Sequence, residues 1–417
     1  MRYSVQWQSL PPATVLCNVA PMKAISIALL AAAGLSLCAN TTAIDHRAAA
    51  RTLDAMIAEN YAYRNDLPHG ELPQSDVLTA ARDAVHDDRT LLAYAEKRIA
   101  SLADHHAITG SSFRDSWAVV PTYTDLWVVA QGDRFIVDSV REGSPAKDAG
   151  VMAGDIIIAV QGVPMGRAVS SFWADLGLGE TPERKDYAAR VLVAGRRDRS
   201  RRITIETRSG VVRDLDLPSL YAVAQQQLAP LSVCNTARST VIRFNNGLGD
   251  QATISAFDEA MRTVPDGNAL VLDLRDTPSG GNTTVARAIM GWFVNEPRGY
   301  QIHNRTVEER ETGIPRQWLE QVLPRKGMVR AQLPTVVVGR WTGSMGEGIA
   351  IGFAALGAEV FGTRMAGLKG SVEDLPAGDA DLSVKLPTER LFTPSGLPRE
   401  DFVPQPLTDD RLVSGAC

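Results

Sequence analysis

The chain has 417 residues, enough for two or three domains with complete hydrophobic cores. Its apolar fraction of 45% and charged fraction of 22% are ordinary for a soluble globular protein. A formal net charge of −5 argues against a surface that binds nucleic acid or an anionic membrane. The six histidines form no ligand motif, so neither a metal nor another cofactor is expected.

A targeting segment is expected over residues 1–43. A charged start near Met22 is followed by a continuous apolar run over 24–39 and then by small residues that offer a cleavage site. The run is short for a bilayer span, so it predicts a cleaved signal, translation from Met22 and no stable membrane span afterwards. Cys38 could carry a lipid instead, but Leu37 is large for the residue before a lipidated cysteine. The expected location is periplasmic or secreted.

Export changes what the cysteines imply. Removal of the signal would leave Cys234 and Cys417 of the four cysteines. Two cysteines in an oxidising compartment are commonly paired, so we expect a disulfide that ties the C-terminal residue to the chain before residue 240. Two free thiols are the alternative.

Residues 45–115 are expected to form a helical domain. Apolar residues recur at helical spacing between Leu53 and Tyr61 and again between Leu91 and Leu102. Between these helices, prolines and a glycine predict a loop.

A β-rich module is expected over residues 118–215. Its stretch FIVDSVREGSPAKDAGVMAGDIIIAVQGVPM, residues 135–165, is similar to the central part of the PDZ domain. In PDZ domains a glycine-rich loop receives the peptide carboxylate, but the counterpart here, residues 124–127, contains Asp125. An aspartate would repel a carboxylate. Whether this module captures C-termini or gates a site therefore stays open.

Strands and helices alternate within residues 230–410. The expected elements are strands at 240–244, 269–274 and 335–338 and helices at 252–263 and 283–293. This alternation predicts a sheet covered by helices. With the two regions before it, the chain is expected to be a mixed α/β multidomain protein.

Ser344 lies where the strand 335–338 gives way to an apolar helix. A serine at such a junction lies at the positive end of the helix dipole, near unpaired N–H groups that can stabilise an oxyanion. The alternative is that Ser344 only caps the helix, with Glu347 completing a capping box. The surrounding residues lack the Gly-x-Ser-x-Gly elbow, which excludes an α/β-hydrolase esterase.

The C-terminal half resembles the tail-specific and carboxyl-terminal processing proteases, including the tricorn-core branch. The resemblance rests on VLDLRDTPSGGNTTVARAI at 271–289, on the segment around Ser344, and on KLPTERLFTPSGLPREDFVP at 385–404. It implies a serine endopeptidase that forms an acyl-enzyme on Ser344 and acts on protein or peptide substrates.

An oxyanion hole is implied at Gly280 and Gly281. A glycine pair lets the backbone approach a substrate carbonyl closely and direct N–H groups at it. The resemblance implies that the N–H groups of Gly280 and Gly281 act together with the N–H of Met345. A plain tight turn is the alternative.

Two residues could activate the serine. In the processing proteases the base is a lysine, and Lys369 occupies its place; its pKa would have to fall from about 10.4 toward neutrality, at a cost of about 4 kcal/mol. In the tricorn-like branch the base is a histidine in an Asp-x-His motif, supported by a glutamate, and these correspond to His106 and Glu400. A histidine needs little tuning near pH 7. We predict His106 as the base, with Lys369 and the neighbouring His105 as alternatives.

A second function stays open at this point. The chain could keep the fold but act as a non-catalytic protein that binds peptides or hydrophobic ligands. The presence of every required residue type argues against it. The sequence does not specify an oligomeric state.

Overall fold

The computed structural model describes residues 45–119, 121–223, 229–236, 239–245, 247–265, 267–378 and 380–407. The predicted signal, with Met22 and Cys38, lies outside these residues. The described residues belong to one compact unit, so the division of the chain into three domains stays a prediction. Within the described ranges, no helix has both the length and the apolar character that a bilayer span requires.

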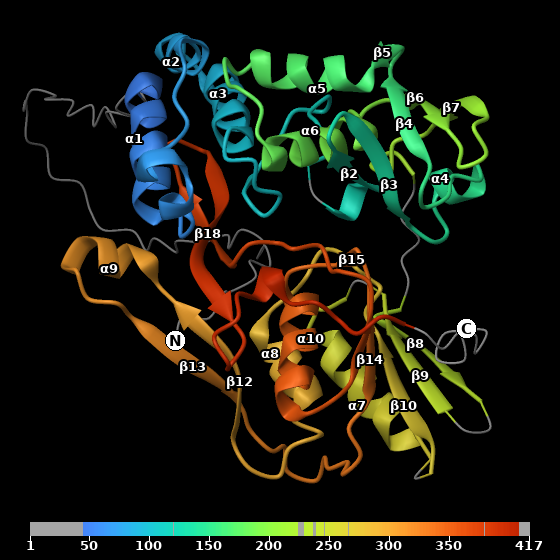
Figure 1. Cartoon of the computed structure of the whole chain (residues 1–417). Coiled ribbons are helices and arrows are strands. Elements are labelled where there is room, and N and C mark those ends of the chain that lie inside the picture. Colours follow the sequence, from blue (N-terminus) through green and yellow to red (C-terminus); the bar gives the residue numbers. More distant parts are fainter. Residues whose placement is uncertain are drawn as a thin grey trace, which may run out of the picture. The chain divides into compact units, whose positions relative to one another are not determined.

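Three helices come first: α1 (His46–Asn60), α2 (Asp76–Asp83) and α3 (Asp88–Ala100), as Figure 1 shows. Each begins where a capping side chain accepts a hydrogen bond from a first-turn N–H, and the caps are Asp45, Ser75 and Asp87. The predicted loop between α1 and α2 contains two short 3₁₀ turns, Arg64–Asp66 and Pro68–Gly70. Apolar residues of α1 and α3 share one core with strand β18 (Ser383–Phe392).

The next elements build an antiparallel sheet in the order β2-β3-β4-β6-β7, with β5 paired to β4. The strands are β2 (Leu126–Gln131), β3 (Arg134–Val140), β4 (Ile156–Val160), β5 (Val163–Pro164), β6 (Arg201–Glu206) and β7 (Val212–Leu217). The helices are α4 (Pro145–Asp148), α5 (Met165–Ala174) and α6 (Pro182–Ala194). Their buried apolar residues form a separate core, in which α6 packs against β2.

A five-stranded sheet forms the centre of the C-terminal half, in the order β16-β14-β10-β9-β8. Only β8 runs antiparallel to its neighbour. Helices α7, α8 and α10 pack on this sheet and share its core (Figure 1). The bounds are β8 (Leu231–Asn235), β9 (Ser239–Phe244), α7 (Ala252–Thr263), β10 (Ala269–Asp273), α8 (Thr283–Met290), β14 (Thr335–Val338), α10 (Met345–Leu356) and β16 (Val360–Gly362).

A second sheet of the C-terminal half has the order β1-β18-β12-β13, with β17 paired to β18. Its short strand β1 begins two residues after His106 and pairs Ile108 with Lys385. This pairing places the segment that follows α3 beside a strand of the C-terminal half. The bounds are β1 (Ile108–Thr109), β12 (Arg298–Asn304), α9 (Thr306–Thr312), β13 (Gln317–Val322) and β17 (Ser371–Pro376).

Two further strands join the loops at the ends of β10 and β14. β11 (Asp276–Thr277) and β15 (Trp341–Thr342) pair in parallel. Because β11 leads to the glycine pair and β15 leads to Ser344, this pairing brings both predicted loops together.

The mixed α/β fold predicted from the sequence is confirmed. The helix predicted at 283–293 ends earlier, at Met290. Cys234 lies on β8 and takes part in a disulfide bond. Its predicted partner, Cys417, lies outside the described residues, so the pairing stays a prediction.

Candidate active site

Ser344 lies between β15 and the first residue of α10. Its backbone has φ 51° and ψ −111°, a left-handed conformation that a non-glycine residue rarely adopts. Its N–H donates to Glu347 Oε2 at 2.8 Å, which is one half of the expected capping box. Its hydroxyl is more than a cap, because Oγ also lies 3.1 Å from His106 Nε2 and can donate to it while its lone pairs accept the N–H of Glu347.

His106 reaches Ser344 from the segment after α3. Ala103 adopts φ 52° and turns the chain out of the helix. Asp104 then accepts the N–H of His106 through Oδ1 and the hydroxyl of Tyr61 through Oδ2, both at 2.8 Å. Asp104 is buried, and these two bonds fix the backbone on which the imidazole stands.

The imidazole of His106 has the tautomer that a general base requires. Its Nδ1 lies 2.6 Å from the carbonyl oxygen of Lys369, and because a carbonyl can only accept, Nδ1 carries the proton. Nε2 is then free to accept a proton from Ser344. Burial, and secondly the charge of Arg399, lower the pKa of His106 to about 4, so the ring is neutral near pH 7.

The two alternative bases lie elsewhere. His105 Nδ1 hydrogen-bonds the carbonyl oxygen of Val119 at 2.8 Å, and its ring stacks on Tyr187. Burial lowers the pKa of His105 to about 3. The ammonium of Lys369 lies over the ring of Tyr63, 5.2 Å from its centroid. The structure therefore brings His106 to the serine hydroxyl, and not His105 or the Lys369 side chain.

Glu400 does not make the predicted contact with His106, whose Nδ1 bonds to the Lys369 carbonyl instead. Glu400 lies on a short 3₁₀ turn, Arg399–Asp401, and its carboxylate faces Tyr63. Burial, and secondly this carboxylate, raise the pKa of Tyr63. Glu400 Oε2 and the Tyr63 hydroxyl are both buried and face each other.

The glycine pair lies directly against the serine. Gly280 has φ 65°, and a Cβ there would come within 2.3 Å of Ser344 Cβ and 2.7 Å of its Oγ. At Gly281 a Cβ would come within 2.1 Å of the Leu248 backbone. Both positions therefore require glycine. Among the described residues, the N–H groups of this pair have no acceptor.

Two helices begin at this point. Met345 is the first residue of α10, and α8 follows Gly281 with Asn282 as its cap. First-turn N–H groups have no partner within their own helix, and the helix dipole is positive there. The surroundings of Ser344 Oγ thus favour an oxygen that acquires negative charge.

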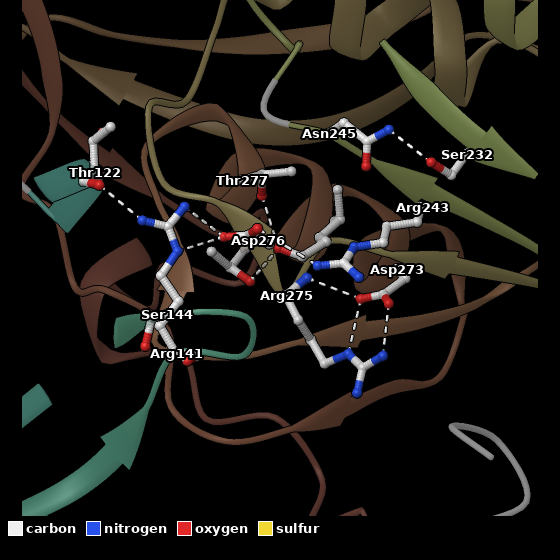
Figure 2. A network of polar contacts seen from close by, with 12 residues as sticks. Thr122, Arg141, Ser144, Ser232, Arg243, Asn245, Asp273, Arg275, Asp276 and Thr277 are labelled. Atoms are coloured by element: carbon white, nitrogen blue, oxygen red, sulfur yellow. Dashed lines mark hydrogen bonds and ion pairs between the residues drawn. The ribbon is translucent and has the colours of Figure 1, made fainter. Parts of the chain in front are cut away.

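Asp276, at the start of the loop that leads to Gly281, bonds to Arg141, which in turn bonds to Thr122 (Figure 2). Arg141, after β3, bonds Asp276 Oδ1 at 2.8 Å through Nε and the carbonyl of Thr122 at 2.7 Å through Nη1. The Thr122 hydroxyl lies 3.0 Å from that of Ser279, the residue before Gly280. These contacts limit how far the glycine pair can move from Ser344.

The carboxylate of Asp125 is not free to repel a peptide, contrary to the expectation from the sequence. It is fully buried, pairs with Arg201 and accepts the N–H of Ala146 at 3.1 Å. The nearby edge of β2 is also occupied. Asp186 accepts the N–H of Ala130 at 2.7 Å, and Arg190 donates to the carbonyl of Val128 at 3.2 Å. A peptide that added to this edge as a strand would have to displace both side chains.

Two buried charged residues near the site were not assigned to it from the sequence. The sequence predicts Glu347 only as a helix cap, but its side chain is fully buried, and burial raises its pKa to about 7. Arg399 precedes Glu400 and is 2% exposed. No group of three or more His, Cys, Asp and Glu side chains in the described part of the chain is arranged to hold a metal ion.

Comparisons with known proteins bear on the fold and on the C-terminal half of the chain. Residues 240–402 match the model of Peptidase family S41, which supports a peptidase. The photosystem II D1 C-terminal processing protease has a similar structure, with a TM-score of 0.53 and 16% identity over 88% of this chain and 94% of its own. Mature CPAF complexed with lactacystin gives a TM-score of 0.51 and 12% identity over 89% of this chain and 96% of its own. No curated protein sequence matches the chain.

The resemblance seen in the sequence is thus confirmed for the fold and for the C-terminal half. Ser344 lies within the matched residues, whereas His106 lies before them. Residues 240–402 of this chain carry the pattern of Peptidase family S41, and the described structure has the fold of the C-terminal processing proteases.

Proposed function

We propose that this chain is an exported serine endopeptidase that hydrolyses peptide bonds in protein or peptide substrates. The observation that carries the proposal is the 3.1 Å contact between Ser344 Oγ and His106 Nε2, beside two helix N-termini. The match of residues 240–402 to Peptidase family S41 supports the same activity.

In the proposed reaction, Ser344 Oγ attacks the peptide carbonyl while His106 Nε2 takes its proton. The carbonyl oxygen becomes an oxyanion, which the N–H groups of Gly280, Gly281 and Met345 stabilise. Nε2 then returns the proton to the leaving amine, and an acyl-enzyme remains on Ser344. Water, deprotonated by the same nitrogen, releases the acid product and restores the serine.

The electrostatics of the site support this sequence of steps. A base must be unprotonated before the attack, and the pKa of about 4 keeps His106 neutral near pH 7. The imidazolium that forms during the attack lies near the carboxylate of Asp104, which favours the charged ring. Lys369 would need its ammonium beside Ser344, but that group lies over Tyr63.

The glycine that touches the serine gives a first prediction. We expect Gly280→Ala to lower kcat/KM by about 100-fold or more, because its Cβ cannot coexist with Ser344 Cβ at 2.3 Å and must displace the nucleophile or the oxyanion donors. Gly132→Ala is the matched control. Gly132 has φ 64° but open space around the added Cβ, so it introduces similar backbone strain without touching the site. Equal losses in both variants would contradict the assignment.

The proposed function is tested with an unstructured protein substrate such as casein. The purified protein should release peptides whose new termini, read by mass spectrometry, lie inside the substrate sequence. If casein and a mixed peptide library both stay intact, the alternative of a non-catalytic peptide-binding protein is favoured. Release of single residues from one end only would contradict an endopeptidase.

A further inference from the structure

The imidazole of His106 is oriented by a backbone group. Its Nδ1 donates to the carbonyl of Lys369 at 2.6 Å, a position that a carboxylate occupies in a Ser-His-Asp triad. A carbonyl oxygen orients the ring only as firmly as its own peptide unit is held. What holds the backbone at Lys369 therefore bears on the geometry of the base.

The segment Gly367–Gly370 belongs to no helix or strand. Arg399 Nη2 donates to the carbonyl of Leu368 at 2.7 Å and to that of Gly370 at 2.8 Å. These are the two carbonyls on either side of the Lys369 carbonyl. One buried guanidinium thus fixes both neighbours and leaves the middle carbonyl to His106.

Two N–H groups of the same segment donate hydrogen bonds to a side chain on helix α10. Glu347 on α10 accepts the N–H of Gly367 at 2.9 Å and that of Leu368 at 3.2 Å, together with the N–H of Ser344 at 2.8 Å. The carboxylate therefore couples this segment to the nucleophile. Arg399 has no such contact with Ser344, so its hydrogen bonds can position the site only through the segment.

We propose that Arg399 is a positioning residue for His106, acting through the Lys369 carbonyl in place of a third carboxylate. The proposal rests on the proposed function, because it concerns the base of that reaction. Glu400, the predicted third member, faces Tyr63, and its neighbour Arg399 reaches the site from the same 3₁₀ turn.

Charge gives Arg399 a second effect on the base. The guanidinium is the largest influence after burial in lowering the pKa of His106. The same guanidinium lowers the pKa of Glu347, which burial raises. The other charged groups on the elements around the ring are Asp104, Lys369 and Glu400. Loss of the guanidinium should therefore raise the pKa of both His106 and Glu347.

The test compares Arg399→Met and Arg399→Lys with the wild type, measuring kcat and KM on one peptide across pH. Arg399→Met should lower kcat by about 10- to 100-fold with KM little changed, since a small displacement of a catalytic group has effects of this size. Its acid limb should move to higher pH. Arg399→Lys should keep the acid limb of the wild type but lose about tenfold in kcat, because an ammonium lacks the planar fork of the guanidinium.

Arg390→Met is the matched control. Arg390 lies over Tyr63 and pairs with Asp66, but it makes no hydrogen bond to the segment Gly367–Gly370. It should keep the kcat and pH profile of the wild type. If Arg399→Met does not fold, as judged by circular dichroism, Arg399→Lys decides alone. A wild-type kcat in Arg399→Lys, or an unmoved acid limb in a folded Arg399→Met, overturns the proposal while leaving the peptidase activity of the wild type in place.

Discussion

Replacing Ser344 with alanine is expected to reduce peptide hydrolysis by about 1,000-fold or more, because the attacking oxygen is removed. The fold should persist. The Ser344 hydroxyl contacts His106 and belongs to the capping box of α10, and losing such contacts costs about 1 kcal/mol of unfolding free energy. Initial rates on a quenched fluorescent peptide and thermal unfolding curves measure both effects.

The control for this substitution is Ser395→Ala. Ser395 is exposed, and its hydroxyl bonds that of Thr393 at 2.9 Å within a turn. It should leave turnover unchanged. Turnover near the wild-type rate in folded Ser344→Ala would show that another residue is the nucleophile.

Removing the imidazole should have a comparable effect, whereas removing the lysine side chain should not. His106→Ala deletes the group 3.1 Å from Ser344 Oγ, and kcat should fall by about 100- to 10,000-fold. Lys369→Ala should stay within about tenfold of the wild type, because the carbonyl that orients His106 belongs to the backbone and is kept. Steady-state kinetics of the two variants, measured side by side, give the comparison.

The opposite ranking would assign the base to Lys369. It would also predict a different pH dependence, since a lysine base works only above its own pKa, ordinarily about 10.4. A pKa of about 4 for His106 predicts instead that its own protonation removes activity only in the acid range. Protonation of Glu347 near pH 7 leaves an oxygen that still accepts N–H groups, so a smaller inflection is expected there.

Local sequence pattern predicted the central sheet well. The buried β-branched run 335–338 and the amphipathic helix 252–263 have the predicted bounds, since each is specified by its own apolar spacing. Strand β13 was not predicted. Most of its residues are exposed, and it lies at the edge of its sheet, so no apolar alternation marks it.

The site could be predicted in part. Ser344 and the glycine pair lie in short motifs, and His106 was found by resemblance, although pairing β1 with β18 is what brings it to the serine. The partner of His106 Nδ1 is a backbone carbonyl, which every residue carries, so no sequence signal exists for it. The prediction that Asp125 would repel a peptide was wrong for a related reason. Its partner Arg201 lies on β6, far from it in the sequence, so no local pattern reveals the pairing.

Reaction with a fluorophosphonate tests the central claim most directly, because the reagent modifies only a serine whose hydroxyl is activated. After reaction and digestion, mass spectrometry should find one phosphonyl group, on the peptide that contains Ser344. The rate of modification should fall by about 100-fold or more in His106→Ala. An unmodified wild-type protein, modification of a different serine, or an unchanged rate in His106→Ala would contradict the assignment of Ser344 and His106 as nucleophile and base.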